Sequence, residues 1–418
     1  MRPRRLVIAL LAGTLLASSG TALAAPTGSG APRADAPSYI AVIDAGSSGT
    51  RLLLYASTPD TLAASFVMKS SPGTAGLSSF ASSPASAGPD AISPLLGQLD
   101  ARLATDGVSV SDVPVALLAT AGMRALRLKD PAGVDAIFAS TEATLDASGH
   151  PVLANRILPE VKEATFAWLD ANALAGTLDR KVGSIGTVEV GGASAQVAFR
   201  SLTSGSPLAA RVVIQGQVIH VNAVSYLGLG SNMARDSLQQ RTEGAAFCFP
   251  NNASGKDPEN YLATTEFPVK SDTATYHQRH CVAAYGRTIA TMDTGKPVAP
   301  SELRTLSGFQ ASTFVGLGAI GAVFQDLKID TSDDERAALD EAVHATCPGA
   351  DAWPRVQALY STPSPFAETV CSTSSYLSSF LFGRHGVGVD PRRFSSRSDT
   401  YGRAPSWPAG FATARLHP

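Results

Sequence analysis

The feature that most constrains this chain is a pattern that occurs twice along it. An apolar run ends at an acidic residue, a turn rich in glycine and hydroxyl side chains follows, and a second apolar run comes after the turn. The first copy covers residues 39–55 and has Asp44 before its turn, and the second covers 186–199 and has Glu189 in that place. Each copy predicts a β-hairpin. The chain therefore contains an internal repeat of one unusual hairpin.

The composition of both turns is typical of a phosphate-binding loop. Glycine lets backbone N–H groups face an anion, and serine or threonine hydroxyls add further donors. The carboxylates of Asp44 and Glu189 can each hold a hydrated Mg²⁺ or Ca²⁺ through oxygen atoms and water. Neither turn carries the Gly-Lys-[Ser/Thr] of a Walker A loop or the G-x-G-x-x-G of a dinucleotide fold. Two such turns predict a polyphosphate site with a divalent cation.

Length and composition fit a globular protein of more than one domain. The chain has 418 residues, of which 44% are hydrophobic and 16% charged, so it is globular and long enough for two domains. Its formal net charge is −2, whereas a nucleic-acid-binding protein of this kind would be basic. We therefore expect no nucleic-acid partner.

The N-terminus has the pattern of a secretory signal. Arg2, Arg4 and Arg5 precede the apolar run 6–16, and small residues follow at 22–24, which predicts a signal peptide over 1–24. The apolar run is shorter than the about 20 residues that span a membrane, so cleavage is favoured over an anchor. Residues 25–37 are rich in Pro, Gly and Ser and predict a flexible lead-in. We expect a secreted or periplasmic protein that is a monomer and has no membrane attachment once the signal peptide is cleaved.

The four cysteines predict two disulfides. They form no CxxC pair and have no histidines at zinc-finger spacing, and an exported chain meets an oxidising environment. Of the three possible pairings, we favour the two that are local in sequence, Cys248–Cys281 and Cys347–Cys371.

Apolar spacing predicts the remaining elements that the argument needs. A buried strand is expected over 114–119, and helices over 131–149, 161–174, 334–346 and 368–382. Residues 71–94 are rich in Ser, Ala and Pro, and we expect a surface loop there that leads into a helix near Leu95.

Several motifs in this order resemble those of the apyrases, the nucleoside triphosphate diphosphohydrolases. They are the segments 44–51, 119–124, 162–164 with Trp168 and Asn172, 191–196, 225–230 with Arg235, and 406–410, together with 76–80 after the first strands. The resemblance spans nearly the whole chain beyond residue 38. It implies an actin/sugar-kinase-like α/β fold: two RNase H-like (actin-like ATPase) domains with the active site in the cleft between them. The implied domains are 38–159 with 397–418, and 160–396.

The resemblance also implies a role for each motif residue. Glu163 matches the general base that activates the attacking water, and Ser194 and Gln196 match the residues that position this water. The phosphate-contacting positions are Ser47, Ser48, Gly49, Thr50, Arg51, Ala121, Gly122, Gly192 and Ala193. The positions near the cation, which is held mainly through water, are Asp44, Thr120, Glu189 and Trp407. The implied cofactor is Mg²⁺ or Ca²⁺, and the implied substrates are nucleoside tri- and diphosphates.

Two departures from the family pattern bear on these roles. Glu189 stands where an aspartate is usual, and its side chain is one methylene longer. Lys162-Glu163-Ala164 replaces the usual acid-acid-glycine, so the choice of Glu163 depends on alignment to Trp168, and Glu160 is the competing carboxylate. Two other functions stay open: an exopolyphosphatase of the same superfamily, and a nucleotide-binding protein without turnover.

Overall fold

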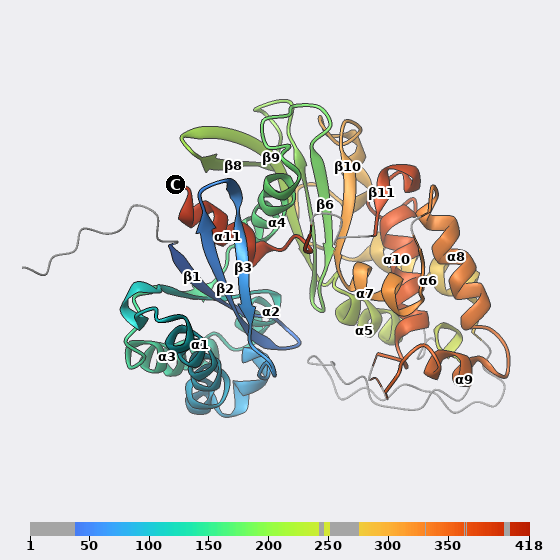
Figure 1. Ribbon diagram of the computed structural model, residues 1–418. Helices are drawn as coiled ribbons and strands as arrows, with labels where there is room; N and C mark the ends of the chain where they lie inside the picture. Colours follow the sequence, from blue (N-terminus) through green and yellow to red (C-terminus); the bar gives the residue numbers. More distant parts are fainter. Residues whose placement is uncertain are drawn as a thin grey trace, which may run out of the picture. The chain divides into compact units, whose positions relative to one another are not determined.

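The computed structural model describes residues 38–241, 246–250, 276–330, 332–362, 364, 366–396 and 402–418. The predicted signal peptide 1–24 and lead-in 25–37 lie outside these residues. Two β-sheets organise the described chain, and each is accompanied by its own set of helices (Figure 1).

The first sheet has five strands in the order β3-β2-β1-β4-β5. Their bounds are β1 (Tyr39–Ala45), β2 (Thr50–Thr58), β3 (Thr61–Lys69), β4 (Val115–Ala119) and β5 (Val152–Ile157). Strands β1 to β3 are antiparallel neighbours, whereas β4 runs parallel to β1 and β5 parallel to β4. The predicted first hairpin and the predicted strand at 114–119 are both confirmed.

The second sheet repeats this plan and adds one edge strand. Its order is β11-β10-β6-β7-β9-β8, with β6 (Ile185–Val190), β7 (Ser194–Arg200), β8 (Ala209–Ile214), β9 (Gln217–Leu227), β10 (Thr313–Gly318) and β11 (Phe394–Ser395). The five strands β9-β7-β6-β10-β11 have the order and directions of β3-β2-β1-β4-β5. The repeat seen in the sequence is thus a repeat of whole sheets, which confirms the expected α/β fold with two RNase H-like units.

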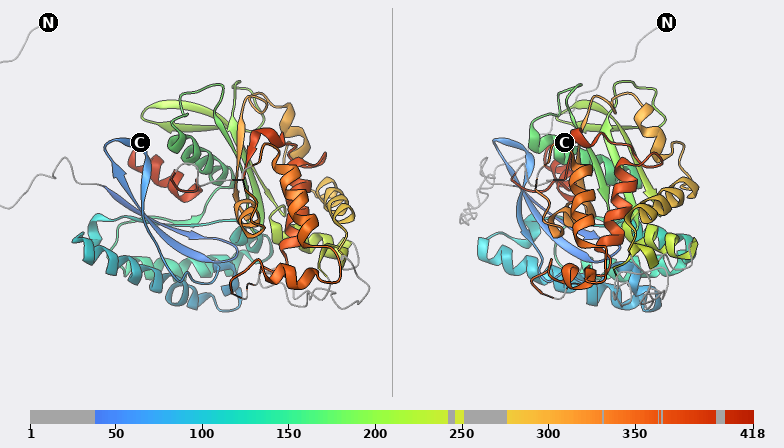
Figure 2. Two further views of the ribbon diagram at one scale, coloured as in Figure 1. Left: turned by 45° about the vertical axis from the view of Figure 1, so that its right-hand side comes forward. Right: turned by 90° about the vertical axis from the view of Figure 1, so that its right-hand side faces the viewer.

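Helices cover the outer faces of both sheets (Figure 2). Those that accompany the first sheet are α1 (Ser93–Asp106), α2 (Ala121–Lys129) and α3 (Pro131–Asp146). Those that accompany the second are α5 (Ser231–Arg241), α6 (Gln278–Thr291), α7 (Ala319–Asp326), α8 (Glu335–Thr346), α9 (Ala352–Gln357) and α10 (Val370–Phe382). Helix α3 begins as predicted after Asp130, whose side chain accepts a hydrogen bond from the Gly133 backbone N–H.

Two helices each pack against the other sheet, not against the one that they follow in the sequence. Helix α4 (Glu160–Ala175) follows the first sheet in sequence but packs against β6, β7 and β9, whereas α11 (Trp407–Leu416) follows the second sheet and packs against β1, β2 and β3. Figure 1 shows α4 and α11 next to each other, and the rings of Phe166 and Phe411 make contact with centroids 5.6 Å apart. A Cβ atom at Gly410 would overlap the Phe166 carbonyl oxygen, so this close crossing requires glycine. The domain division at residues 159/160 and 396/397 stays a prediction.

Burial on both faces explains why β1 is a continuous apolar run. Ala41 and Ile43 pack in the cluster that includes α1 and α3, whereas Ile40 and Val42 face the cluster that includes Phe411 of α11. The strand that carries Asp44 is therefore held from both sides.

The segment 71–94 differs from its prediction. It contains the 3₁₀ turns η1 (Leu77–Ser82) and η2 (Pro84–Ser86) and the π-helical turn η3 (Ala87–Ile92), which runs directly into α1. A Cβ atom at Gly88 would overlap the Ser140 carbonyl oxygen of α3. The small residues that suggested a loop are therefore packing residues, because they let these turns approach α3 closely.

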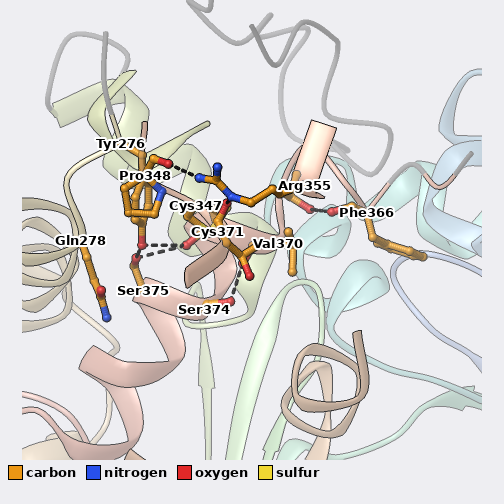
Figure 3. Close-up of a disulfide and its surroundings, with 12 residues drawn as sticks. Tyr276, Gln278, Cys347, Pro348, Arg355, Phe366, Val370, Cys371, Ser374 and Ser375 are labelled. Atoms are coloured by element: carbon orange, nitrogen blue, oxygen red, sulfur yellow. Dashed lines mark hydrogen bonds between the residues drawn. A yellow bond between two sulfur atoms is a disulfide. The ribbon is translucent and has the colours of Figure 1, made fainter. Parts of the chain in front are cut away.

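Both predicted disulfides are confirmed. Cys248 is bonded to Cys281 at the start of α6, and Cys347 after α8 is bonded to Cys371 of α10. Figure 3 shows the second bond among polar neighbours. There Tyr276 Oη and Ser375 Oγ are 2.6 Å apart, and Ser375 donates to the Cys371 carbonyl at 3.1 Å. In the part of the chain that the structure describes, no helix combines the length and apolar character needed to cross a membrane.

Candidate active site

The two glycine-rich turns have the same local structure. Ala45 and Thr50 are the last pair of the first hairpin, and the Gly46 N–H donates to the Gly49 carbonyl at 2.9 Å. In the second hairpin the turn closes through Gly191, whose N–H donates to the Ser194 carbonyl at 3.0 Å. Each acid lies two residues before its turn glycine. Asp44 is consequently paired across the strands with Arg51, and Glu189 with Gln196.

Helix starts pack tightly on both turns. A Cβ atom at Gly122, the second residue of α2, would lie 2.9 Å from the Ser47 Cα atom. A Cβ atom at Gly230, just before α5, would overlap the backbone of Gly192 and Ala193. The start of α2 therefore brings backbone N–H groups next to the first turn, the arrangement that favours anions.

Asp44 is buried and paired with an arginine. Its side chain is 2% exposed, and Oδ2 lies 2.6 Å from Nη2 of Arg51. Burial raises the pKa of Asp44, and the Arg51 guanidinium partly opposes this shift.

Glu163 lies in the first turn of α4 and is held by an arginine from α2. Arg124 Nη2 donates to Glu163 Oε2 at 2.7 Å and approaches Ser194 Oγ at 3.3 Å. Burial raises the pKa of Glu163, and Arg124 partly lowers it again. A carboxylate with a raised pKa is the usual form of a general base.

A buried polar chain continues from Glu163 into the second sheet. Gln196 Nε2 donates to Ser194 Oγ at 2.5 Å and to Ser225 Oγ at 2.9 Å, and all three side chains are buried. The structure thus places Ser194 between Arg124 and Gln196. The predicted base and the two predicted water-positioning residues form one connected network.

Glu189 is the acid without a counter-charge of its own. Its Oε2 atom is buried and has no hydrogen-bond partner among the described residues. Burial, with the negative charges of Glu163 and Asp44, raises the pKa of Glu189 to about 8, although Arg51 acts in the opposite direction. Three acids therefore share this region with Arg51 and Arg124, which leaves an excess of negative charge.

This excess fits a divalent cation that is contacted through water. Among the described residues, no three His, Cys, Asp or Glu side chains are grouped closely enough to coordinate a metal directly. The orphaned Glu189 Oε2 and the buried Asp44 carboxylate are suited to hydrogen bonds from the water shell of Mg²⁺ or Ca²⁺.

The competing carboxylate Glu160 has a different environment. Lys296 pairs with its Oε1 atom, and the Glu160 side chain is 33% exposed. The Glu163 side chain is only 7% exposed and pairs with Arg124, which also approaches Ser194 at the end of the second turn. The geometry therefore favours Glu163 as the base.

Some predicted positions have other partners in this structure. The Thr50 hydroxyl donates to the Ala75 carbonyl at 2.8 Å, so it links the first turn to a later segment of the chain. Ser48 is exposed at the tip of this turn. Trp407 is buried in the cluster that contains Val42 and Leu118, and its place beside the cation stays a prediction. Thr120 is buried and directly precedes α2, and its N–H donates to the Ala45 carbonyl at 3.1 Å.

Arg124 is the residue that sequence reasoning missed. It closes the motif 119–124, but we assigned it no role, because its carboxylate partner lies 39 positions further along the chain. The sequence did contain a sign of this role. Arg124 follows Thr120 by about one helical turn, so its charged side chain faces the same region as Thr120.

Known proteins are similar to this chain in sequence. A probable apyrase of Arabidopsis thaliana is 26% identical over 407 residues, which cover 86% of this chain and 78% of that protein. Human ectonucleoside triphosphate diphosphohydrolase 2 is 30% identical over 59% of this chain, but the match spans only 54% of the human protein.

Solved structures share the fold. A nucleoside triphosphate hydrolase from Neospora caninum has a TM-score of 0.56 at 16% identity and covers 91% of this chain and 92% of its own. An Aquifex aeolicus member of the Ppx/GppA family has a TM-score of 0.50 at 13% identity and covers 91% of this chain and 98% of its own. The model of the GDA1/CD39 (nucleoside phosphatase) family matches residues 32–285, a stretch that contains both hairpins, α2 and the start of α4. The chain therefore belongs to the GDA1/CD39 family.

Proposed function

We propose that this protein is a divalent-cation-dependent apyrase that converts nucleoside tri- and diphosphates to monophosphates and inorganic phosphate. The observation that carries this proposal is the buried network Glu163–Arg124–Ser194–Gln196, which connects the base to the second of two matching turns. The family and its curated relatives support the same substrate class.

Glu163 activates the attacking water. Arg124 holds its Oε2 atom, and its Oε1 atom accepts a proton while the water oxygen bonds to the terminal phosphorus. The bond from this phosphorus to the bridging oxygen breaks in line with the attack. Ser194 and Gln196 orient the water, and their mutual hydrogen bond fixes the Ser194 hydroxyl.

The two turns hold the phosphate chain. Backbone N–H groups of residues 47–49 and 192–193 face the phosphate oxygens, and Arg51 adds a positive charge beside the first turn. When it is bound through its water shell near Asp44 and Glu189, the cation offsets the negative charge that the phosphates carry.

This arrangement also sets where hydrolysis ends. Two turns suit a substrate with at least two linked phosphates, and a monophosphate occupies only one turn. Cleavage of a monophosphate would also expel a sugar alkoxide, which is a much poorer leaving group than a phosphate. We therefore infer that the nucleoside monophosphate accumulates.

A phosphate-release assay over ATP, ADP, AMP, pyrophosphate and long-chain polyphosphate, each with Mg²⁺, Ca²⁺ or EDTA, tests this function. ATP and ADP should yield AMP and phosphate only when a cation is present, and chromatography should detect no adenosine. Hydrolysis of polyphosphate with nucleotides untouched would identify an exopolyphosphatase. Nucleotide binding without phosphate release would identify a binding protein.

We also propose that the protein acts outside the cytoplasm. Structural disulfides form and persist mainly in oxidising compartments, and the sequence 1–24 has the pattern of a cleaved signal. Mass spectrometry of the exported protein should find a new N-terminus at Ala25.

A further inference from the structure

A cavity of about 790 Å³ lies directly beside the candidate active site. Arg124 belongs to both, because it lines the cavity and also binds Glu163 and Ser194. Leu227, another lining residue, is the cross-strand neighbour of Ser194. Glu160 lines the cavity one helical turn before Glu163. The cavity therefore adjoins the residues that hold the attacking water.

This position has a directional consequence, which depends on the proposed function. In an in-line displacement the water attacks the phosphorus from the side opposite the leaving group. Glu163, Ser194 and Gln196 define the water's side, and the nucleotide lies on the other. The cavity is thus on the side of the terminal phosphate that is remote from the nucleotide.

The lining of the cavity suits an oxyanion that passes through it. Arg127, Arg156 and Lys296 line it together with Arg124. Arg127 pairs with Asp135 at 2.9 Å and Lys296 pairs with Glu160. Arg156 is exposed and forms no ion pair within the described part of the chain. The acids Asp135, Glu142 and Glu160 also line the cavity. Asn155, Thr294 and apolar side chains such as Phe138 and Ile157 supply the rest of the wall.

We propose that this cavity is the route by which inorganic phosphate leaves the active site, with Arg156 as the cation that receives it. Phosphate then departs on the water's side while the shortened nucleotide still occupies its own side. Phosphate release precedes nucleotide release, and the route also admits the next water.

Filling the cavity tests the route. Ala139 of α3 is exposed and lines the cavity, so Ala139→Trp places a large ring there without disturbing the core. Ala136, one turn earlier on the same helix, is equally exposed but does not line it, so Ala136→Trp is the matched control. Rapid chemical quench measures the cleavage of ATP, and a fluorescent phosphate sensor measures the appearance of free phosphate.

We expect Ala139→Trp to slow the appearance of free phosphate at least about tenfold relative to cleavage, whereas in Ala136→Trp and the wild type both signals coincide. Coincident signals in Ala139→Trp would overturn the route. A KM for ATP within about twofold of the wild-type value in Ala139→Trp shows that the nucleotide side is intact.

Charge reversal tests the receiving cation without any turnover. Inorganic phosphate binding is measured by calorimetry in EDTA for the wild type, Arg156→Glu and Arg211→Glu, the last being an exposed arginine of β8 that does not line the cavity. We expect binding at least about tenfold weaker in Arg156→Glu only. Equal affinity in all three proteins, or none in the wild type, would overturn the assignment. Phosphate binding by a wild type that hydrolyses no nucleotide would support this site and reject the proposed function.

Discussion

One nitrogen of Arg124, Nη2, lies 2.7 Å from Oε2 of Glu163. Arg124 belongs to α2 and Glu163 to α4. This contact therefore joins a helix that accompanies the first sheet to the helix that packs on the second sheet. The same nitrogen approaches Ser194 Oγ, so one guanidinium contacts both the proposed base and a residue proposed to position the water.

Replacement of Glu163 should abolish turnover but keep binding. Glu163→Gln has nearly the same size and polarity but cannot accept the proton, so we expect kcat to fall about 10²-fold or more, the scale of general-base catalysis. Nucleotide affinity, measured by calorimetry, should stay within a few-fold. Glu341→Gln, an exposed change on α8, is the control. If Glu160→Gln rather than Glu163→Gln loses turnover, the two carboxylates exchange roles.

Replacement of Arg124 should move the acidic limb of the pH profile. Glu163 works ionised, so activity falls as pH drops through its pKa. Arg124 lowers this pKa by its charge and its hydrogen bond. Arg124→Gln removes both effects, and we expect the acidic limb of kcat to move to higher pH. Arg124→Lys keeps the charge, so its acidic limb should lie close to the wild-type position. An unshifted limb in Arg124→Gln would show that Arg124 does not act on Glu163.

Local patterns predicted what local interactions determine. The hairpins around Asp44 and Glu189 follow from short apolar runs and glycine-rich turns, and the disulfides follow from cysteine number and spacing. The Arg124–Glu163 contact and the Lys296–Glu160 pair could not be predicted, because they join residues 39 and 136 positions apart. Only the fold brings these charges together. The Lys296–Glu160 pair is the contact that distinguishes Glu160 from Glu163, the two candidate bases.

Packing overrode composition in the segment 71–94. Its small residues indicated a surface loop, but the segment forms 3₁₀ and π-helical turns, and Gly88 fits closely against α3. The side chain of Trp407 lies among core residues, and its place beside the cation stays a prediction. Composition does not reveal whether a small or aromatic residue faces solvent, a ligand or a neighbouring helix.

A buried ion pair should stabilise the connection to α11. Arg403 binds Asp170 of α4 with two hydrogen bonds of 2.6 and 2.7 Å, and the Ser406 N–H adds a third at 2.9 Å. Asp170→Ala leaves these donors without their acceptor, so we expect the free energy of unfolding to fall by about 3–5 kcal/mol. Asp106→Ala breaks the exposed pair with Arg102 and should cost at most about 1 kcal/mol. Chemical denaturation of both variants measures the difference, and equal losses would mean that the buried pair is not the stronger one.

Glu189 should make the cation-free protein less stable as pH rises. Its pKa is raised from 4.5 to about 8 in the folded state, mainly by burial. The folded state therefore holds this proton more tightly than the unfolded state, and between these two pH values the contribution of Glu189 to stability falls with increasing pH. Glu189→Gln removes the titrating group, so in EDTA its melting temperature should match that of the wild type near pH 5 and exceed it by several degrees at pH 8. Excess Mg²⁺ or Ca²⁺ at pH 8 should stabilise the wild type more than the variant, because only the wild type has the charge that the cation offsets. Thermal melts at both pH values, with and without cation, measure all of these differences, and Glu341→Gln should behave like the wild type throughout. Parallel pH dependence of wild type and Glu189→Gln would show that Glu189 is not the excess acid of this site.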